Sequence, residues 1–216
     1  MKKTVLIFGD SNSWGWMPEN DLISPIRRWD DDVRWAGVMQ KELGDDYKVI
    51  VDGLNGRTTV WDDPIEEYRC GKNQIIPTMD AQAPFDLIII FVGTNDLKVR
   101  YTVSAQDIAN GASILVLKAL RQTGAYATGE PKVLLVGPPP LGPVEKGIFK
   151  DMFGGNEEKS KQLAKFYKGV AEANSVEFID AGAVVKSSEI DGLHLDADQH
   201  ALLGKAMAKK VRDILF

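Results

Sequence analysis

The chain has 216 residues, of which 44% are hydrophobic and 26% are charged, as in an ordinary globular protein with one buried core. Its net charge is −5 and it has no basic stripe, so nucleic acid, which requires clustered Lys and Arg, is not an expected partner. No run approaches the roughly 18 apolar residues of a membrane span, so no membrane association is expected.

The first apolar run, residues 4–8, follows two lysines, as the apolar core of a secretory signal peptide does. Five residues are fewer than the roughly 7–15 of such a core, and Gly9 and Asp10 end the run. The single cysteine, Cys70, excludes an intrachain disulfide and fits a reducing compartment. We therefore expect a cytoplasmic protein.

Five short apolar runs alternate with segments of helical periodicity along the chain. Strands are predicted at residues 4–8, 48–51, 86–92, 132–137 and 176–179. Helices are predicted at residues 32–43, 104–122, 156–174 and 197–214. This alternation indicates a three-layer α/β/α fold with a parallel sheet, and right-handed crossovers favour the flavodoxin-like strand order 2-1-3-4-5. Without a repeat or a linker, residues 1–216 are expected to form one domain.

Two predicted loops, residues 12–31 and 138–155, are longer than a plain connection requires. Both carry large apolar side chains, such as Trp16 and Phe149. Apolar side chains on long loops usually cover a pocket or contact another subunit. We therefore expect a pocket wall here and a homo-oligomer.

Polar clusters directly follow the first and third predicted strands. Gly9-Asp10-Ser11 ends the first, and Gly93-Thr94-Asn95-Asp96 ends the third. In the predicted strand order, the switch point lies between these two strands, where open α/β sheets bind ligands. The sequence thus predicts a functional site at this edge.

Ser11 is the candidate nucleophile, because a serine on a tight turn after a strand is exposed at that edge. A serine hydroxyl requires an adjacent base, and the chain has only two histidines. His194 follows Asp191 by three residues, which allows the carboxylate to orient the imidazole. His200 lies within the last predicted helix, where a packing role is expected.

Donors for a developing oxyanion are also present. Asn95 offers a side-chain amide, the turn from Gly53 to Gly56 allows a backbone N–H to approach a ligand, and Ser11 offers its own N–H. Each motif alone is also explained as an ordinary turn. Together, at three neighbouring strand ends, they favour acyl transfer.

Gly9-Asp10-Ser11, Gly56, the 93–96 cluster and Asp191-Gly192-Leu193-His194 resemble the four sequence blocks of the GDSL-type SGNH hydrolases. The segments Trp14-Gly15-Trp16 and Pro138-Pro139-Pro140-Leu141 are similar to those of the aryl esterase and acyltransferase branch. The resemblance implies the SGNH hydrolase fold, with Ser11 as nucleophile, His194 as base and Asp191 as its orienting carboxylate. It further implies an oxyanion hole formed by Ser11, Gly56 and Asn95. The best-known member of that branch has alanine at the position of Gly56, so Gly53 is an alternative donor.

Substrate contacts are assigned to Trp16, Trp14 and Leu193, although both tryptophans also fit a role in packing the nucleophile loop. Asp10 and Asp96 are interpreted as anchors of their turns. The acidic runs lack His or Cys at ligand spacing, so neither a metal nor a cofactor is expected.

These features predict a serine esterase that hydrolyses short-chain acyl esters, including aryl esters, through an acyl-serine intermediate. The expected partners are a small-molecule ester and water, or an alcohol that accepts the acyl group. One alternative is a carbohydrate deacetylase acting on acetyl-xylan or oligosaccharides with the same three residues. Another is a flavodoxin-like phosphate- or nucleotide-binding module, which leaves the pairing of Asp191 with His194 unexplained.

Overall fold

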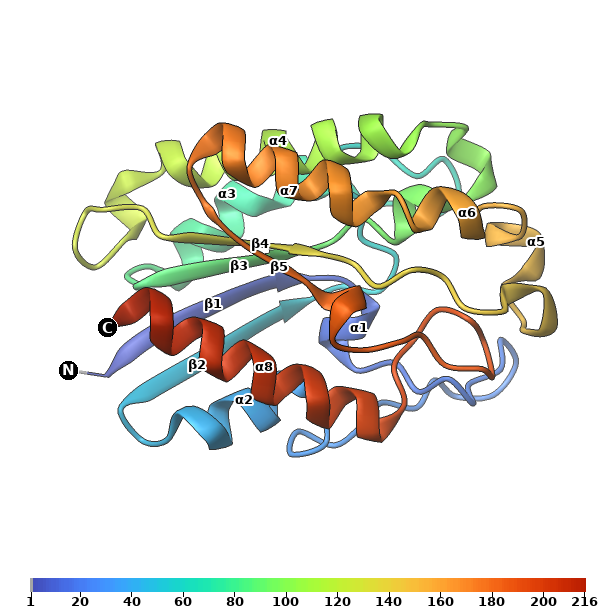
Figure 1. Ribbon diagram of the computed structural model, residues 1–216, viewed down its shortest axis with the longest axis horizontal. Coiled ribbons are helices and arrows are strands. Elements are labelled where there is room, and N and C mark those ends of the chain that lie inside the picture. Colours follow the sequence, from blue (N-terminus) through green and yellow to red (C-terminus); the bar gives the residue numbers. More distant parts are fainter. Residues whose placement is uncertain (1) are drawn as a thin grey trace.

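A five-stranded parallel sheet forms the centre of the computed structural model, which describes residues 2–216 (Figure 1). Its strands are β1 (Lys3–Gly9), β2 (Tyr47–Gly53), β3 (Leu87–Phe91), β4 (Val133–Gly137) and β5 (Glu177–Asp180). The strand order is β2-β1-β3-β4-β5, and all neighbouring strands are parallel. The predicted sheet and its strand order are therefore confirmed.

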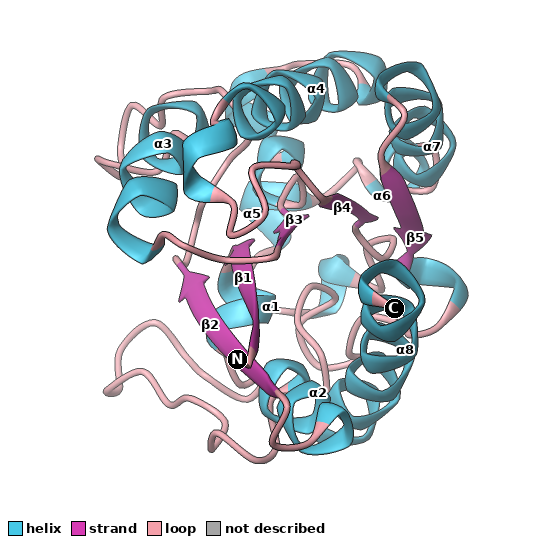
Figure 2. Cartoon of the chain, turned by 90° about the vertical axis from the view of Figure 1, so that its left-hand side faces the viewer, coloured by secondary structure: helices cyan, strands magenta, loops and turns pink. Residues whose placement is uncertain are grey.

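Helices cover both faces of this sheet, as Figure 2 shows. The helices α2 (Trp35–Leu43) and α8 (Ala197–Leu215) pack on one face. The other face is covered by α3 (Gly71–Gln82), α4 (Ala105–Arg121) and α7 (Leu163–Asn174). The predicted three-layer α/β/α architecture is correct.

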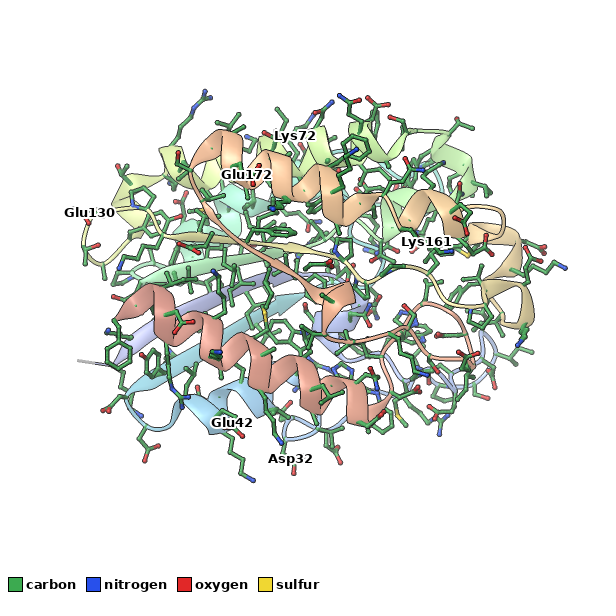
Figure 3. All side chains as sticks on the ribbon, in the orientation of Figure 1. Asp32, Glu42, Lys72, Glu130, Lys161 and Glu172 are labelled. Carbon is green, nitrogen blue, oxygen red and sulfur yellow. The ribbon has the colours of Figure 1, made fainter. Side chains whose placement is uncertain are left out.

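Alternating residues of each central strand supply the two halves of the core. In β1, Val5 and Ile7 face α2 and α8, whereas Leu6 and Phe8 face the layer of α3, α4 and α7. All four side chains are fully buried. Because both faces are covered, these strands are continuous apolar runs rather than alternating polar and apolar residues. Glu42, labelled in Figure 3, is exposed on α2 and projects outward from the helix.

The predicted set of helices requires two corrections. Helix α3 was not predicted, because Pro77 lies within it and only two large apolar side chains, Ile75 and Met79, are buried. The predicted helix 156–174 is two helices, α6 (Glu157–Ser160) and α7. Within residues 2–216, no helix is both long enough and apolar enough to cross a membrane.

Short helical turns occupy the loops at the carboxyl ends of the strands. They include α1 (Ser11–Trp14), η1 (Asn95–Leu97), η2 (Val99–Tyr101), η4 (Val144–Lys146) and α5 (Lys150–Phe153). In Figure 1, α1 and α5 lie toward the end of the molecule to which the strand arrows point. The remaining short turns are η3 (Thr123–Ala125) and η5 (Ala181–Ala183).

Candidate active site

Ser11 is the first residue of α1, directly after β1. Asp10 caps this short helix by accepting a hydrogen bond from the Asn12 amide at 3.0 Å. A Cβ atom on Gly9 would lie 2.1 Å from the Ser13 hydroxyl oxygen, so the close approach of helix to strand requires glycine. This turn holds the Ser11 hydroxyl at the carboxyl edge of the sheet.

Ser11, His194 and Asp191 form a continuous hydrogen-bonded chain. His194 Nε2 lies 2.9 Å from Ser11 Oγ, and His194 Nδ1 lies 2.6 Å from Asp191 Oδ2. The other oxygen of Asp191 accepts hydrogen bonds from the backbone amides of Leu193 at 2.9 Å and His194 at 3.0 Å. The structure thus brings together three residues from opposite ends of the sequence.

The environment of Asp191 favours its ionised form. Burial raises the pKa of this carboxyl, but the opposing effects of the His194 ring and the two backbone amides are larger together. They hold the pKa of Asp191 below its usual range. An ionised Asp191 accepts the Nδ1 proton, which leaves His194 Nε2 free to accept the proton of Ser11.

His200 occupies a different environment on α8. Its side chain is fully buried, and its Nδ1 accepts a hydrogen bond from the Trp35 amide at 3.2 Å. Burial, reinforced by the positive charge of Arg34, lowers the pKa of His200 to about 3. This histidine is therefore neutral and joins α8 to α2, as its predicted packing role requires.

Asn95 and Gly56, the other two predicted oxyanion donors, line the same cavity as Ser11. Asn95 begins η1 after β3, and its Nδ2 donates a hydrogen bond to the Arg57 carbonyl at 3.1 Å. Ser11, Gly56 and Asn95 all line one cavity, which Gly53 does not. Gly53 instead packs against α1, since a Cβ atom there would lie 2.5 Å from the Trp14 nitrogen. Gly56 has a φ of +79°, which only glycine adopts readily.

Buried polar contacts fix the turn that carries Gly56. Asp96, next to Asn95, accepts hydrogen bonds from the amide and the hydroxyl of Thr59. Arg57 donates to the carbonyl oxygens of Gly9 at 2.8 Å and of Asp52 at 2.7 Å. These contacts tie the turn to the ends of β1, β2 and β3. Asp96 therefore has the anchoring role that the sequence predicts for it.

Burial also raises the pKa of two carboxyls near the nucleophile, Asp10 to about 6 and Asp96 to about 7. For Asp10, the Asn12 amide is the largest opposing effect, and for Asp96 it is the Thr59 hydroxyl. Neither carboxyl is hydrogen-bonded to Ser11 or His194 among residues 2–216.

The cavity above Ser11 has a volume of about 460 Å³ and an apolar wall. Trp16 stacks on the His194 ring with centroids 5.3 Å apart, and Phe149 meets the same ring edge-on at 5.6 Å. Leu193 lines the cavity beside them. Trp14, also predicted to contact substrate, lies outside the cavity, where its ring packs against the Arg28 guanidinium at 4.8 Å. We therefore do not retain Trp14 as a substrate-binding residue.

A second wall of the cavity is charged, and the sequence patterns did not indicate it. Glu66, Arg69, Lys98 and Arg100 line it. Charged residues on predicted loops are usually solvated, so only the position of Lys98, three residues after Asn95, was a signal. Among residues 2–216, no group of three or more His, Cys, Asp or Glu side chains is arranged to hold a metal ion.

The family model described as the GDSL-like lipase/acylhydrolase family matches residues 7–202, a span that includes Ser11, Gly56, Asn95, Asp191 and His194. The chain belongs to this family. A comparison with curated proteins gave no match.

Solved structures similar to this GDSL-like chain include esterases of two kinds. The aryl esterase of M. smegmatis is 41% identical, with a TM-score of 0.92, over 98% of this chain and 99% of its own. Est24, a carbohydrate acetylesterase from Sinorhizobium meliloti, is 42% identical, with a TM-score of 0.92, over the whole of both chains. A putative arylesterase from Agrobacterium tumefaciens str. C58 is 37% identical, with a TM-score of 0.83, over 98% and 99% of the two chains. The fold is that of the SGNH hydrolases.

Proposed function

We propose that this protein, a carboxylic ester hydrolase of the SGNH type, acts through Ser11 as nucleophile, His194 as general base and Asp191 as the residue that orients His194. The observation that carries the proposal is the hydrogen-bonded chain of these three side chains, 2.9 Å and 2.6 Å long at its two links, at the cavity. This chemistry needs no metal ion or cofactor.

The reaction proceeds in two steps. Ser11 Oγ attacks the ester carbonyl as His194 Nε2 takes its proton, and Asp191 stabilises the resulting imidazolium. The tetrahedral oxyanion is stabilised by the backbone N–H groups of Ser11 and Gly56 and by the Asn95 side chain. His194 then protonates the leaving alcohol, which gives the acyl-serine, and water activated by the same histidine hydrolyses it.

The proposed substrates are esters of short acyl groups, including aryl esters. The apolar wall of Trp16, Phe149 and Leu193 flanks His194, where the leaving alcohol must receive its proton. Such a wall suits an aromatic alcohol and excludes water from the acyl-serine. An alcohol bound against this apolar wall is then proposed to compete with water for the acyl group of the acyl-serine.

A carbohydrate deacetylase with the same catalytic residues is the second candidate, favoured by the 42% identity to Est24 over the full length of both chains. The two candidates differ in the preferred alcohol. Comparison of kcat/KM for aryl acetates and acetylated xylo-oligosaccharides distinguishes them. A higher value for the aryl acetates supports the first proposal, and a higher value for the oligosaccharides supports the second.

Replacement of the nucleophile tests the proposed reaction. Ser11→Ala is expected to abolish turnover of p-nitrophenyl acetate, because no hydroxyl remains to form the acyl-enzyme, while the circular dichroism spectrum stays unchanged. His194→Ala is expected to abolish turnover as well, because it removes the base. His200→Ala is expected to retain turnover, because His200 is not the base. Near-parental turnover in a folded Ser11→Ala protein would contradict the proposal.

Self-association is proposed from the surface around the cavity. Leu22, Ile26 and Ile65 line the cavity yet are more than half exposed, and neighbouring Ile23 is almost fully exposed. Exposed apolar groups of this kind mark contact surfaces in soluble proteins. A homo-oligomer covers them. The single cysteine supports a cytoplasmic location for this assembly.

A further inference from the structure

Two charged side chains, Glu66 and Arg69, pack closely against the turn that carries Gly56. A Cβ atom on Gly56 would lie 2.8 Å from Glu66 Oε2 and 3.2 Å from Arg69 Nε. Both side chains therefore reach the backbone that supplies one of the proposed oxyanion donors. Arg69 therefore lines the cavity beside the Gly56 turn.

The charges that line the cavity do not balance. Arg69, Lys98 and Arg100 are cationic, and Glu66 is the single carboxylate among the lining residues. Asp63, buried behind them, pairs with Lys98 at 3.1 Å and with Arg100 at 2.9 Å. Three positive charges against two negative charges leave an excess of one positive charge beside the site.

Asp63 is ionised, and its charge is paired with Lys98 and Arg100. Burial raises the pKa of this carboxyl, but hydrogen bonds from the amides of Ile65 and Glu66 and from Tyr101 and Lys98 outweigh burial and hold it well below its usual range. Its charge is thus committed to Lys98 and its other neighbours, and it does not offset a further cation.

Arg69 is the cation left without a carboxylate hydrogen bond among the lining residues of the described chain, residues 2–216. Lys98 bonds Glu66 at 2.8 Å, and Arg100 bonds Asp63 at 2.9 Å. Arg69 Nε lies 3.7 Å from Glu66 Oε2, too far for a hydrogen bond, and Nη1 donates only to the Glu67 carbonyl at 3.0 Å. Its guanidinium is therefore only loosely paired with Glu66, without a hydrogen bond to it, and retains unused donors.

We propose that Arg69 is a substrate-recognition residue that binds a carboxylate carried by the ester. A guanidinium presents paired N–H donors that match the two oxygens of a carboxylate, and such charge-assisted bonds are stronger than those to a neutral hydroxyl. The excess positive charge favours an anionic partner for the same reason. This inference rests on the proposed ester hydrolysis at Ser11.

Two pairs of esters test the proposal, each with an anion and a neutral compound of nearly the same shape. In para-acetoxybenzoate the carboxylate is on the leaving alcohol, with para-acetoxyacetophenone as its neutral counterpart. In monoethyl succinate the carboxylate is on the acyl group, with ethyl levulinate as its neutral counterpart. Arg69→Gln removes the charge, and Arg121→Gln, at an exposed position at the end of α4, makes the same change in net charge elsewhere.

Arg69→Gln is expected to lower kcat/KM for the anion of at least one pair by about tenfold, mainly through KM, because a charge-assisted hydrogen bond is lost. For each neutral ester kcat/KM is expected to fall much less than for its anion, because no charge-assisted hydrogen bond is lost, and Arg121→Gln is expected to leave kcat/KM for all four esters unchanged. The pair that responds identifies the half of the ester that carries the carboxylate. Equal losses for anion and neutral ester, or no loss for either anion, would overturn the inference. Failure of the proposed hydrolysis is separate, because it appears as turnover of the neutral esters by Ser11→Ala.

Discussion

At the scale of single residues, the site is formed by short-range contacts that the sequence motifs describe well. Asp191 accepts hydrogen bonds from two amides of its own loop and from the ring of His194, so the motif itself contains the carboxylate that orients the imidazole. The motif around Ser11 likewise contains the cap, Asp10, that starts α1. These residues were predictable because their partners are close in sequence or belong to the same motif.

Asn95 permits a quantitative test at this scale. Asn95→Ala removes a proposed donor to the oxyanion, which exists only during the reaction, so kcat is expected to fall by about 10²–10³-fold with little change in KM. Steady-state kinetics with p-nitrophenyl acetate measure both constants. Asn110→Ala, at an exposed position on α4, is the matched control and is expected to retain full activity. An unchanged kcat in Asn95→Ala would exclude this donor.

At the scale of elements, strands were predicted more accurately than helices. Strands buried on both faces are unmistakable apolar runs, and β1 and β3 owe their positions to this pattern. Helix α3 was not predicted because few of its residues face the core and Pro77 interrupts its helical periodicity. Its position depends on tertiary contacts, such as Ile75 and Met79 in the core beside α4, which sequence periodicity does not express.

His200, at the contact of α8 with α2, predicts how stability depends on pH. Its pKa is about 3 in the folded protein against an ordinary value of 6.5, so the unfolded chain binds the additional proton between these values. Stability from this group is therefore present above pH 6.5 and is lost as the pH falls. The loss is about 2 kcal/mol by roughly pH 5.

Urea unfolding measures this dependence. From pH 7 to pH 5, the free energy of unfolding of His200→Asn is expected to change by about 2 kcal/mol less than that of the parent protein, because the variant lacks the titrating group. Other titrating groups, Asp10 and Asp96 among them, are common to both proteins and cancel in the comparison. Identical changes in both proteins would contradict the assigned environment of His200.

At the scale of the whole molecule, the cavity combines one apolar and one charged wall from loops that are distant in sequence. Trp16 and Phe149 belong to loops that were predicted to cover a pocket, and Phe149 and Trp16 do contact the His194 ring. The charged wall was not predictable, because the pairing of Lys98 with Asp63 depends on how two loops meet in space. Pocket shape is thus a tertiary property.

The exposed apolar groups around this cavity predict the oligomeric state. Ile23 is 96% exposed and Leu22 is 66% exposed, an unfavourable arrangement for a monomer in water. Multi-angle light scattering at micromolar concentration is expected to give a mass at least twice the 23.8 kDa of one chain. Replacement of both residues by serine is expected to lower that mass. A mass of one chain for the parent protein would contradict self-association.

Covalent labelling with a fluorophosphonate tests the central claim most directly, because only a serine activated by a neighbouring base reacts readily with this probe. Mass spectrometry of the labelled parent protein is expected to show one adduct, on the peptide that contains Ser11. The Ser11→Ala and His194→Ala proteins are expected to remain unlabelled under the same conditions. An adduct on another residue, or none on active parent protein, would contradict the assignment of Ser11 as the nucleophile.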